Sequence, residues 1–417
     1  MIGLSRPGHP LRPLAAEVPL HDLDEDFPRD LGAAAQQPDW TDSVQVAAAR
    51  AELARLPGLV TGEEVRLLRT LLAEAAGGHY LVIQAGDCAE DPAECEPATV
   101  LRKAGLLDAL AGVMVAGTGR PVVRVGRIAG QFAKPRSATT ERVDGVELPV
   151  YRGHLVNGPE PTAEARRPDP RRLLECYDAA HRAVTYLRQR TSDWTLPTGA
   201  PVWTSHEALV LDYELPLLRR TAAGDVLLAS THLPWIGERT RHPDGPHARM
   251  LAQVANPVAC KVGPTTRPDD LLALCSRLDP GREPGRLTLI SRMGAAKVRT
   301  ALPPLVTAVR SAGHRVAWLC DPLHGNTVKS PSGVKVRSVR TVVAEVRAFL
   351  DVVAAAGGTP AGLHLETTPH DVAECVWADP AELDAEAAPA AHASLCDPRL
   401  NPAQAVEVAR AWATAPV

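Results

Sequence analysis

The chain has 417 residues, of which 45% are hydrophobic and 23% charged, and its formal net charge is −4 at pH 7. These values are typical of a globular protein in water, and the length is enough for a large α/β core. A slightly acidic protein has no general attraction to nucleic acid or to an anionic membrane, so any basic function must be local. The aromatic content of 4% also gives no base-stacking stripe for nucleic acid.

The N-terminal residues carry Pro and charges where a signal peptide needs an apolar segment. No apolar run approaches the ~18 residues that suggest a membrane span. The eight cysteines are scattered and form no CxxC pair, as is usual in a reducing compartment. The sequence therefore predicts a cytoplasmic protein without membrane or nucleic-acid partners.

The N-terminal region, residues 1–78, precedes the first predicted strand and contains two predicted helices, at about 43–56 and 62–76. We interpret it as a mostly helical extension that packs on the following domain or on a partner subunit. The catalytic domain is expected to cover residues 79–417.

A pattern of an apolar run, polar residues and then a helical stretch recurs along this second region. The eight apolar runs lie at 80–90, 121–137, 201–209, 225–241, 257–265, 287–295, 315–327 and 361–369. Predicted helices with a 3.6-residue period lie at 97–116, 171–190, 207–221, 268–278, 297–311 and 338–356. Strands that alternate with helices over roughly 300 residues predict an α/β fold, the (β/α)8 TIM barrel.

Two segments interrupt this pattern. Residues 138–170, after the second strand, form a loop too long for an ordinary connection and are expected to contribute to an active-site rim. The Ala-rich residues 381–394 are expected to form a flexible loop or a loose helix.

The strand ends carry most of the chemistry, because the carboxyl ends of barrel strands meet at the face that holds the active site. In "WLCDPLHGNTV" (318–328), for example, an apolar run ends in Asp321, His324 and Asn326. A single polar residue at a strand end is usually just solvated, but eight in succession favour a shared site. The residues at these ends include Cys88, Glu90, Arg127, His206, Glu207, Glu238, Arg239, Lys261, Arg292, Asp321, His324 and Glu366.

The basic residues near these ends imply a ligand with several negative charges, because Arg offers a planar fork to carboxylate or phosphate and Lys a point charge. "KPRS" (134–137) adds a hydroxyl beside two cations and resembles a phosphate clamp. The alternative is that the cations form structural salt bridges with Glu207, Glu238 and Glu366. The group consists of Arg127, Lys134, Arg136, Arg239, Lys261 and Arg292.

A second group could bind a metal ion. It combines a thiol, an imidazole and two carboxylates, a set that suits Mn²⁺, Fe²⁺, Co²⁺ or Zn²⁺ better than Mg²⁺ alone. Its long sequence separations leave the alternative of a buried core cysteine and a structural histidine. Its members are Cys88, His324, Glu366 and Asp397.

These same stretches resemble the type II 3-deoxy-D-arabino-heptulosonate 7-phosphate (DAHP) synthases, and they occur in order between residues 84 and 401. No Walker loop, GxGxxG, HExxH or GxSxG motif competes with this resemblance. The matching stretches are "QAGDCAE" (84–90), "GRIAGQFAKPRS" (126–137), "HLPWIGERTR" (232–241), "NPVACKVGPT" (256–265), "LISRMG" (289–294), "DPLHGNT" (321–327), "LHLETTP" (363–369) and "CDPRLN" (396–401).

The resemblance implies a transferase, 3-deoxy-7-phosphoheptulonate synthase, which condenses phosphoenolpyruvate with D-erythrose 4-phosphate and water in the first step of the shikimate pathway to chorismate and the aromatic amino acids. By position it assigns a divalent ion, Mn²⁺ first and Co²⁺, Fe²⁺ or Zn²⁺ as alternatives, to Cys88, His324, Glu366 and Asp397. It assigns phosphoenolpyruvate to Arg127, Glu238, Arg239, Lys261 and Arg292. It assigns erythrose 4-phosphate to Lys134, Arg136 and Ser137.

The chemistry expected of these residues agrees with that reaction. Phosphoenolpyruvate carries a phosphate next to a carboxylate, which matches the dense cationic group. Glu238 is expected to help remove a proton from the attacking water, and Lys261 to act as an acid or an electrostatic stabiliser. Cys396 directly precedes a predicted ligand, so it is either a redox partner of Cys88 or a buried structural thiol.

Two other functions stay open. An amino-DAHP synthase-like enzyme would use an imino aldose phosphate, and His154 in "YRGHLVNG" and the tract after "AEC" (373–375) depart from the family pattern at the rim. A non-catalytic barrel would regulate a partner such as chorismate mutase, although the complete ligand set disfavours it. The protein is expected to be a homo-oligomer, a dimer or tetramer. Its short regulatory regions suggest weak feedback inhibition and a role in secondary metabolism.

Overall fold

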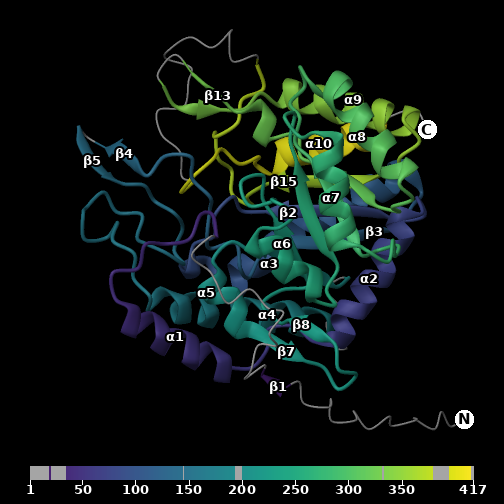
Figure 1. The fold of residues 1–417 in the computed structure, drawn as a ribbon. Helices are drawn as coiled ribbons and strands as arrows, with labels where there is room; N and C mark the ends of the chain where they lie inside the picture. The colour runs from purple at the N-terminus through teal and green to yellow at the C-terminus, as the bar shows by residue number, and fades with distance from the viewer. Residues whose placement is uncertain are drawn as a thin grey trace, which may run out of the picture.

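The computed structural model describes residues 18–19, 34–143, 145–192, 200–330, 333–378 and 394–414. Its centre is a closed barrel of eight strands in which every neighbouring pair is parallel (Figure 1). This confirms the predicted (β/α)8 TIM barrel. The strands are β2 (Leu81–Gly86), β3 (Val122–Arg127), β6 (Val202–Glu207), β9 (Leu233–Ile236), β10 (Val258–Val262), β11 (Leu287–Ser291), β12 (Ala317–Cys320) and β15 (Pro360–Glu366).

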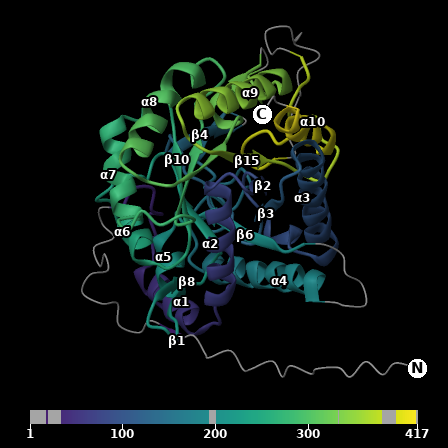
Figure 2. The same ribbon diagram turned by 90° about the vertical axis from the view of Figure 1, so that its right-hand side faces the viewer.

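Helices surround the barrel (Figures 1 and 2). Four of them, α3, α6, α7 and α10, have Pro in the first turn, where its missing N–H costs nothing. Among them α6 and α10 were not predicted. The helices of the barrel are α3 (Pro97–Thr118), α4 (Arg172–Ser192), α5 (Leu211–Glu214), α6 (Pro246–Gln253), α7 (Pro268–Leu278), α8 (Val298–Ser311), α9 (Val339–Ala355) and α10 (Pro402–Ala413).

The predicted helix at 207–221 is wrong beyond a single turn. After α5 the chain forms a short 3-10 helix, Leu215–Leu217, and then the strand β7, Leu218–Arg220. Pro216 lies in the first turn of the 3-10 helix and cannot supply an N–H to a continuing α-helix. The apolar residues that follow are recruited into strand pairing instead.

The predicted strand run at 225–241 contains two separate strands. β8, Val226–Leu228, pairs antiparallel with β7, and β7 also pairs with β1, Val18–Pro19, so that the three form a small sheet outside the barrel. Only β9 enters the barrel. A local apolar pattern does not distinguish these two destinations, because partner choice depends on distant segments.

The two helices predicted in the N-terminal extension are present as α1 (Ser43–Arg55) and α2 (Gly62–Ala76). A capping box between Thr61 and Glu64 begins α2. Leu68, Leu72 and Ala75 of α2 are fully buried in one cluster with residues at the amino ends of the strands. The extension therefore packs on the barrel and closes it at the amino ends of the strands, which we call the lower end. The strand residues of the cluster include Val82, Val123, Leu233, Ala259, Ala317 and Ala361.

Two hairpins rise beside the opposite end of the barrel. β4 (Thr140–Val143) pairs with β5 (Val146–Pro149) after β3, and β13 (Val328–Lys329) pairs with β14 (Lys335–Val336) after β12. The first hairpin lies inside the segment predicted to form a rim. The loop predicted at 381–394 lies almost wholly outside the described residues. In the described part of the chain no helix has the length and apolarity to cross a membrane.

Candidate active site

A cavity of about 610 Å³ opens at the carboxyl ends of the barrel strands. All twelve residues assigned to metal or substrates line it: Cys88, Arg127, Lys134, Arg136, Ser137, Glu238, Arg239, Lys261, Arg292, His324, Glu366 and Asp397. Thr140, Glu141 and Val150 from the predicted rim also contribute. Nine basic and five acidic side chains line the cavity, so it suits an anion although the protein is net acidic.

The metal-binding group forms around His324, Glu366 and Asp397, whose ligand atoms lie within 4.8 Å of one another. Nε2 of His324 is 3.2 Å from Oε1 of Glu366. Nδ1 of the same ring lies 2.7 Å from Oδ2 of Asp321. Although burial opposes ionisation, His324 and Lys261 hold the pKa of Asp321 well below its usual range. When Nδ1 donates to this carboxylate, Nε2 is left to face Glu366 and to ligate a metal ion, the arrangement found in metal-binding histidines.

The surrounding positive charges favour the ionised form of both carboxylates of this group. Burial would raise the pKa of Glu366, but His324, Lys134 and Arg337 hold it well below its usual value. Burial likewise opposes ionisation of Asp397, but Lys134, Arg337 and Lys335 together outweigh it and lower the pKa of Asp397. Two carboxylates beside an imidazole form a set of potential ligands that suits a divalent cation.

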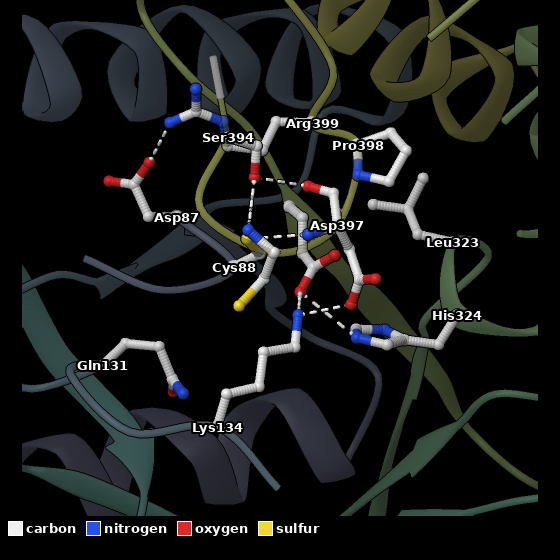
Figure 3. Close-up of polar contacts among 12 residues, drawn as sticks. Asp87, Cys88, Gln131, Lys134, Leu323, His324, Ser394, Asp397, Pro398 and Arg399 are labelled. Carbon is white, nitrogen blue, oxygen red and sulfur yellow. Dashed lines mark hydrogen bonds and ion pairs between the residues drawn. The ribbon is translucent and has the colours of Figure 1, made fainter. Parts of the chain in front are cut away.

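Lys134 points into the same group (Figure 3). Its Nζ lies 2.5 Å from Oδ2 of Asp397 and 3.5 Å from Oε1 of Glu366. The second contact of Asp397 is with Nζ of Lys335, at 2.8 Å. The carboxylates are thus balanced by ammonium groups that also line the anion cavity.

Cys88 lies beside the three ligands but outside the group that meets within 4.8 Å. Its Sγ accepts a hydrogen bond from the backbone N–H of Asp397 at 3.4 Å and lies 3.1 Å from the hydroxyl of Ser394. Burial opposes ionisation of the thiol, but a hydrogen bond with Cys396 and the charge of Lys134 lower the pKa of Cys88 to about 6. A thiolate next to two carboxylates and an imidazole fits the predicted Mn²⁺, Fe²⁺, Co²⁺ or Zn²⁺. Cys396 contacts Cys88 as expected, and its redox role stays a prediction.

Arg127, at the end of β3, is fixed by contacts on three sides. Its Nε donates to the carbonyl of Asp87 at 2.8 Å, Nη1 lies 2.7 Å from Nε2 of His364, and Nη2 lies 3.0 Å from Oε1 of Glu366. The guanidinium also lies over the Trp235 ring, 5.2 Å from its centroid. A buried, preorganised guanidinium suits a carboxylate or phosphate at a defined position.

Lys261, on β10, projects into the cavity next to Asp321. Its Nζ lies 3.1 Å from Oδ2 of Asp321 and 5.9 Å from the centroid of the Trp235 ring. Burial lowers the pKa of Lys261, and Asp321 only partly offsets this effect. A lysine that loses its proton more readily is suited to proton transfer near neutral pH.

The alternative of structural salt bridges holds for part of the cationic group. Arg127 and Lys134 contact Glu366, and Arg136 contacts Glu141 at 3.1 Å. Glu238 instead pairs with Arg241 at 2.9 Å. Even so, the basic side chains of the cavity outnumber the acidic ones: Arg127, Lys134, Arg136, Arg239, Lys261, Arg292, Lys329, Lys335 and Arg337 against Glu141, Glu207, Glu238, Glu366 and Asp397.

Glu207 is one of the polar strand-end residues predicted from the sequence, but it received no role there beyond that of a salt-bridge partner. It ends β6, and its Oε1 is buried without a hydrogen-bond partner among the described residues. Burial raises the pKa of Glu207, against the charges of Lys261 and Lys134. A Cβ on Gly237 would lie 2.0 Å from this oxygen, so a larger residue there would displace the Glu207 carboxyl from its present position. Its position at a strand end was the available signal.

Together these features define a class: a (β/α)8 barrel with a cationic cavity and a group of potential metal ligands at the carboxyl ends of its strands. The chain matches the model of the class-II DAHP synthetase family over residues 29–197 and 191–413. It belongs to this family, which confirms the resemblance seen in the sequence.

Similar proteins agree with this assignment. The chain is 53% identical over 384 residues to a probable phospho-2-dehydro-3-deoxyheptonate aldolase of Pseudomonas fluorescens. This alignment covers 92% of this chain and 95% of that protein. The chain is 38% identical over 427 residues to the phospho-2-dehydro-3-deoxyheptonate aldolase of Mycolicibacterium smegmatis, spanning 90% of this chain and 91% of that one. The solved structure of the aldolase of the same name from Francisella tularensis has a TM-score of 0.50 and 12% identity, and it covers 88% of this chain and 95% of that chain. This last likeness supports the fold alone.

Proposed function

We propose that this protein is a 3-deoxy-7-phosphoheptulonate synthase, which condenses phosphoenolpyruvate with D-erythrose 4-phosphate and water to give DAHP and phosphate, the first step of the shikimate pathway. The observation that carries this proposal is the position of the His324, Glu366 and Asp397 group against the cationic cavity. Membership of the class-II DAHP synthetase family supports it.

Phosphoenolpyruvate would bind to the deeper cations. Arg127, Lys261 and Arg292 line the cavity near Trp235 and can contact adjacent phosphate and carboxylate groups. The aldose phosphate would bind nearer the rim, at Arg136 and Ser137. Arg239 donates to the Ser137 hydroxyl and so joins the two subsites.

The metal site would be formed by His324, Glu366 and Asp397, with the Cys88 thiolate beside them. A bound divalent ion, Mn²⁺ in our proposal, would supply Lewis-acid polarisation of the aldehyde carbonyl. Asp321 orients His324, and Arg337 fixes Glu366 through a 2.7 Å contact. Asp321 and Arg337 would therefore position the metal ligands without taking part in the reaction.

The bond changes need one proton donor and one acceptor. The enol C3 of phosphoenolpyruvate forms the new C–C bond with the aldehyde carbon, and Lys261 can donate a proton to the aldehyde oxygen. Water then adds to the electron-poor C2 and gives up one proton. When the C2–O bond to phosphate breaks, the new hydroxyl becomes the C2 carbonyl and its remaining proton leaves with the phosphate. Glu207 and Glu238 both line the cavity, and each has a buried oxygen without a hydrogen-bond partner among the described residues, so either carboxylate can accept this proton.

The test is an assay of the purified, Mn²⁺-loaded protein with both substrates, in which loss of phosphoenolpyruvate and product mass are followed together. We expect equal amounts of DAHP and phosphate. Turnover only with an imino aldose phosphate would favour the amino-DAHP synthase-like enzyme. Phosphoenolpyruvate that binds but is not consumed with either electrophile would favour the non-catalytic barrel.

A further inference from the structure

A polar layer crosses the barrel interior between the apolar lower end and the cavity. Gln84 on β2, Ser205 on β6 and His364 on β15 are all fully buried. The proposed chemistry uses none of them. Because burying such groups costs free energy unless they are hydrogen-bonded, their partners indicate what they do.

The direction of each hydrogen bond in this layer can be assigned from one end. The Ser205 hydroxyl donates to the carbonyl of Gly126 at 2.9 Å, so its oxygen accepts from Nε2 of Gln84 at 3.0 Å. The free Oε1 of Gln84 then accepts from Nδ1 of His364 at 2.8 Å. A guanidinium can only donate, so Nη1 of Arg127 donates to Nε2 of His364 at 2.7 Å. The imidazole is therefore neutral, with its proton on Nδ1.

We propose that Gln84 and His364 form a positioning relay that holds the Arg127 guanidinium in the orientation that binds the phosphoenolpyruvate carboxylate or phosphate. This inference rests on the proposed function, in which Arg127 contacts that substrate. A neutral acceptor orients the guanidinium and leaves its charge available, whereas a carboxylate at position 364 would neutralise it. The one carboxylate that contacts Arg127 among the described residues, Glu366, belongs to the metal-binding group.

Trp235 fixes the ring of this relay. Its indole packs edge-on against His364, with centroids 5.3 Å apart and an interplanar angle of 88°. The same indole lies against both Arg127 and Lys261. The imidazole, the guanidinium and the indole therefore hold one another in place at the floor of the cavity.

The test measures binding of phosphoenolpyruvate to the Mn²⁺-loaded enzyme by calorimetry in His364→Phe. This variant keeps a ring against Trp235 but removes the acceptor for Arg127. We expect the Kd for phosphoenolpyruvate to rise between about ten- and a hundredfold, the range for losing a hydrogen bond to a charged group. The Mn²⁺ affinity and the KM for the aldose phosphate should stay near wild type, because Arg337 still holds Glu366 and the rim is untouched. A purely structural role would shift all three together.

Matched variants separate the relay from general disruption. His314→Phe changes another buried histidine, which contacts Asp279 away from the cavity, and should leave the Kd unchanged. His364→Gln restores an acceptor and should recover much of the affinity. If His364→Phe does not fold, Gln84→Met removes the partner that fixes the tautomer and should also raise the Kd. A folded His364→Phe protein that binds phosphoenolpyruvate with wild-type affinity would contradict the relay but not the proposed function. Wild-type protein that does not bind phosphoenolpyruvate would contradict both.

Discussion

The two ends of the barrel are made by the same eight strands but carry opposite kinds of side chain. At the amino ends, Val82, Val123 and Leu233 pack against Leu68 and Leu72 of α2. At the carboxyl ends the cavity is lined mainly by charged groups. The comparison shows that stability and chemistry are separated along the barrel axis, as is usual in this fold. Substitutions at the lower end should therefore change stability, and those at the mouth should change activity.

Metal removal should have the largest effect. Dialysis against a chelator should abolish nearly all turnover, because the aldehyde loses its Lewis acid, and Mn²⁺ should restore it. Mn²⁺ should also raise Tm, since it would bind the folded His324, Glu366 and Asp397 group but not the unfolded chain. A coupled phosphate-release assay and a thermal melt with and without ion measure both effects. Full turnover in excess chelator would contradict the metal site.

Lys261→Met should lower kcat by about 10²–10³-fold, the range for removing one preorganised charge stabiliser or proton donor. The free energy of unfolding should change much less than kcat does, because the methionine fills a similar volume. Lys329→Met, at an exposed lysine of the same cavity, serves as the control and should stay close to wild type. Normal turnover with wild-type affinity for phosphoenolpyruvate would remove Lys261 from the mechanism.

Leu72→Ala should lower the free energy of unfolding by ~2–5 kcal/mol, because it leaves a cavity under the barrel. Leu72 is fully buried, whereas Leu67 on the same helix is 52% exposed. Leu67→Ala should therefore change stability by no more than about 0.5 kcal/mol. Denaturant titration gives both values, and kcat of the folded Leu72→Ala protein should match wild type. A large loss of kcat in Leu72→Ala would contradict the separation of stability and activity between the two ends of the barrel.

Glu345, which contacts Gly294 and Asn326 beyond the carboxyl ends of β11 and β12, should make the stability of the mouth depend on pH. Burial raises the pKa of Glu345 from 4.5 to about 8, with the N–H of Gly294 partly opposing it. Between these two values the folded state binds more protons than the unfolded state, so stability is full below about pH 4.5 and falls as pH rises towards 8. A shift of this size corresponds to a total change of about 4–5 kcal/mol. Glu345→Gln should flatten this slope in denaturant titrations at pH 5 and pH 8, and an unchanged slope would assign the dependence to other groups.

The fold could be predicted because each barrel strand is a continuous apolar run and the helices between them have clear periodicity. The failure at 207–221 has a physical reason: Pro216 ends the helix, and β7 forms only because β8 and β1 come from elsewhere in the chain. The same limit applies to 225–241, where one apolar stretch supplies two different sheets.

The site could be predicted wherever a functional residue ends a strand. The sequence did not indicate a role for Arg337, because it ends no barrel strand and its contact with Glu366 exists only in the folded chain. His364 was missed because its polar side chain sits inside a strand, where only the partners reveal its role. Glu207 was seen, but its lack of a partner depends on the space beside Gly237. The oligomeric state, a chorismate mutase partner, a role in secondary metabolism and the cytoplasmic location stay predictions.

The convergence of the strand ends on one metal and one anion can be measured by anomalous diffraction from crystals of the Mn²⁺-loaded protein with phosphoenolpyruvate. We predict a single strong peak bonded to His324, Glu366 and Asp397, with the Cys88 sulfur as a fourth ligand and the substrate held by Arg127 and Lys261. A peak elsewhere, or phosphoenolpyruvate bound away from these cations, would contradict the account.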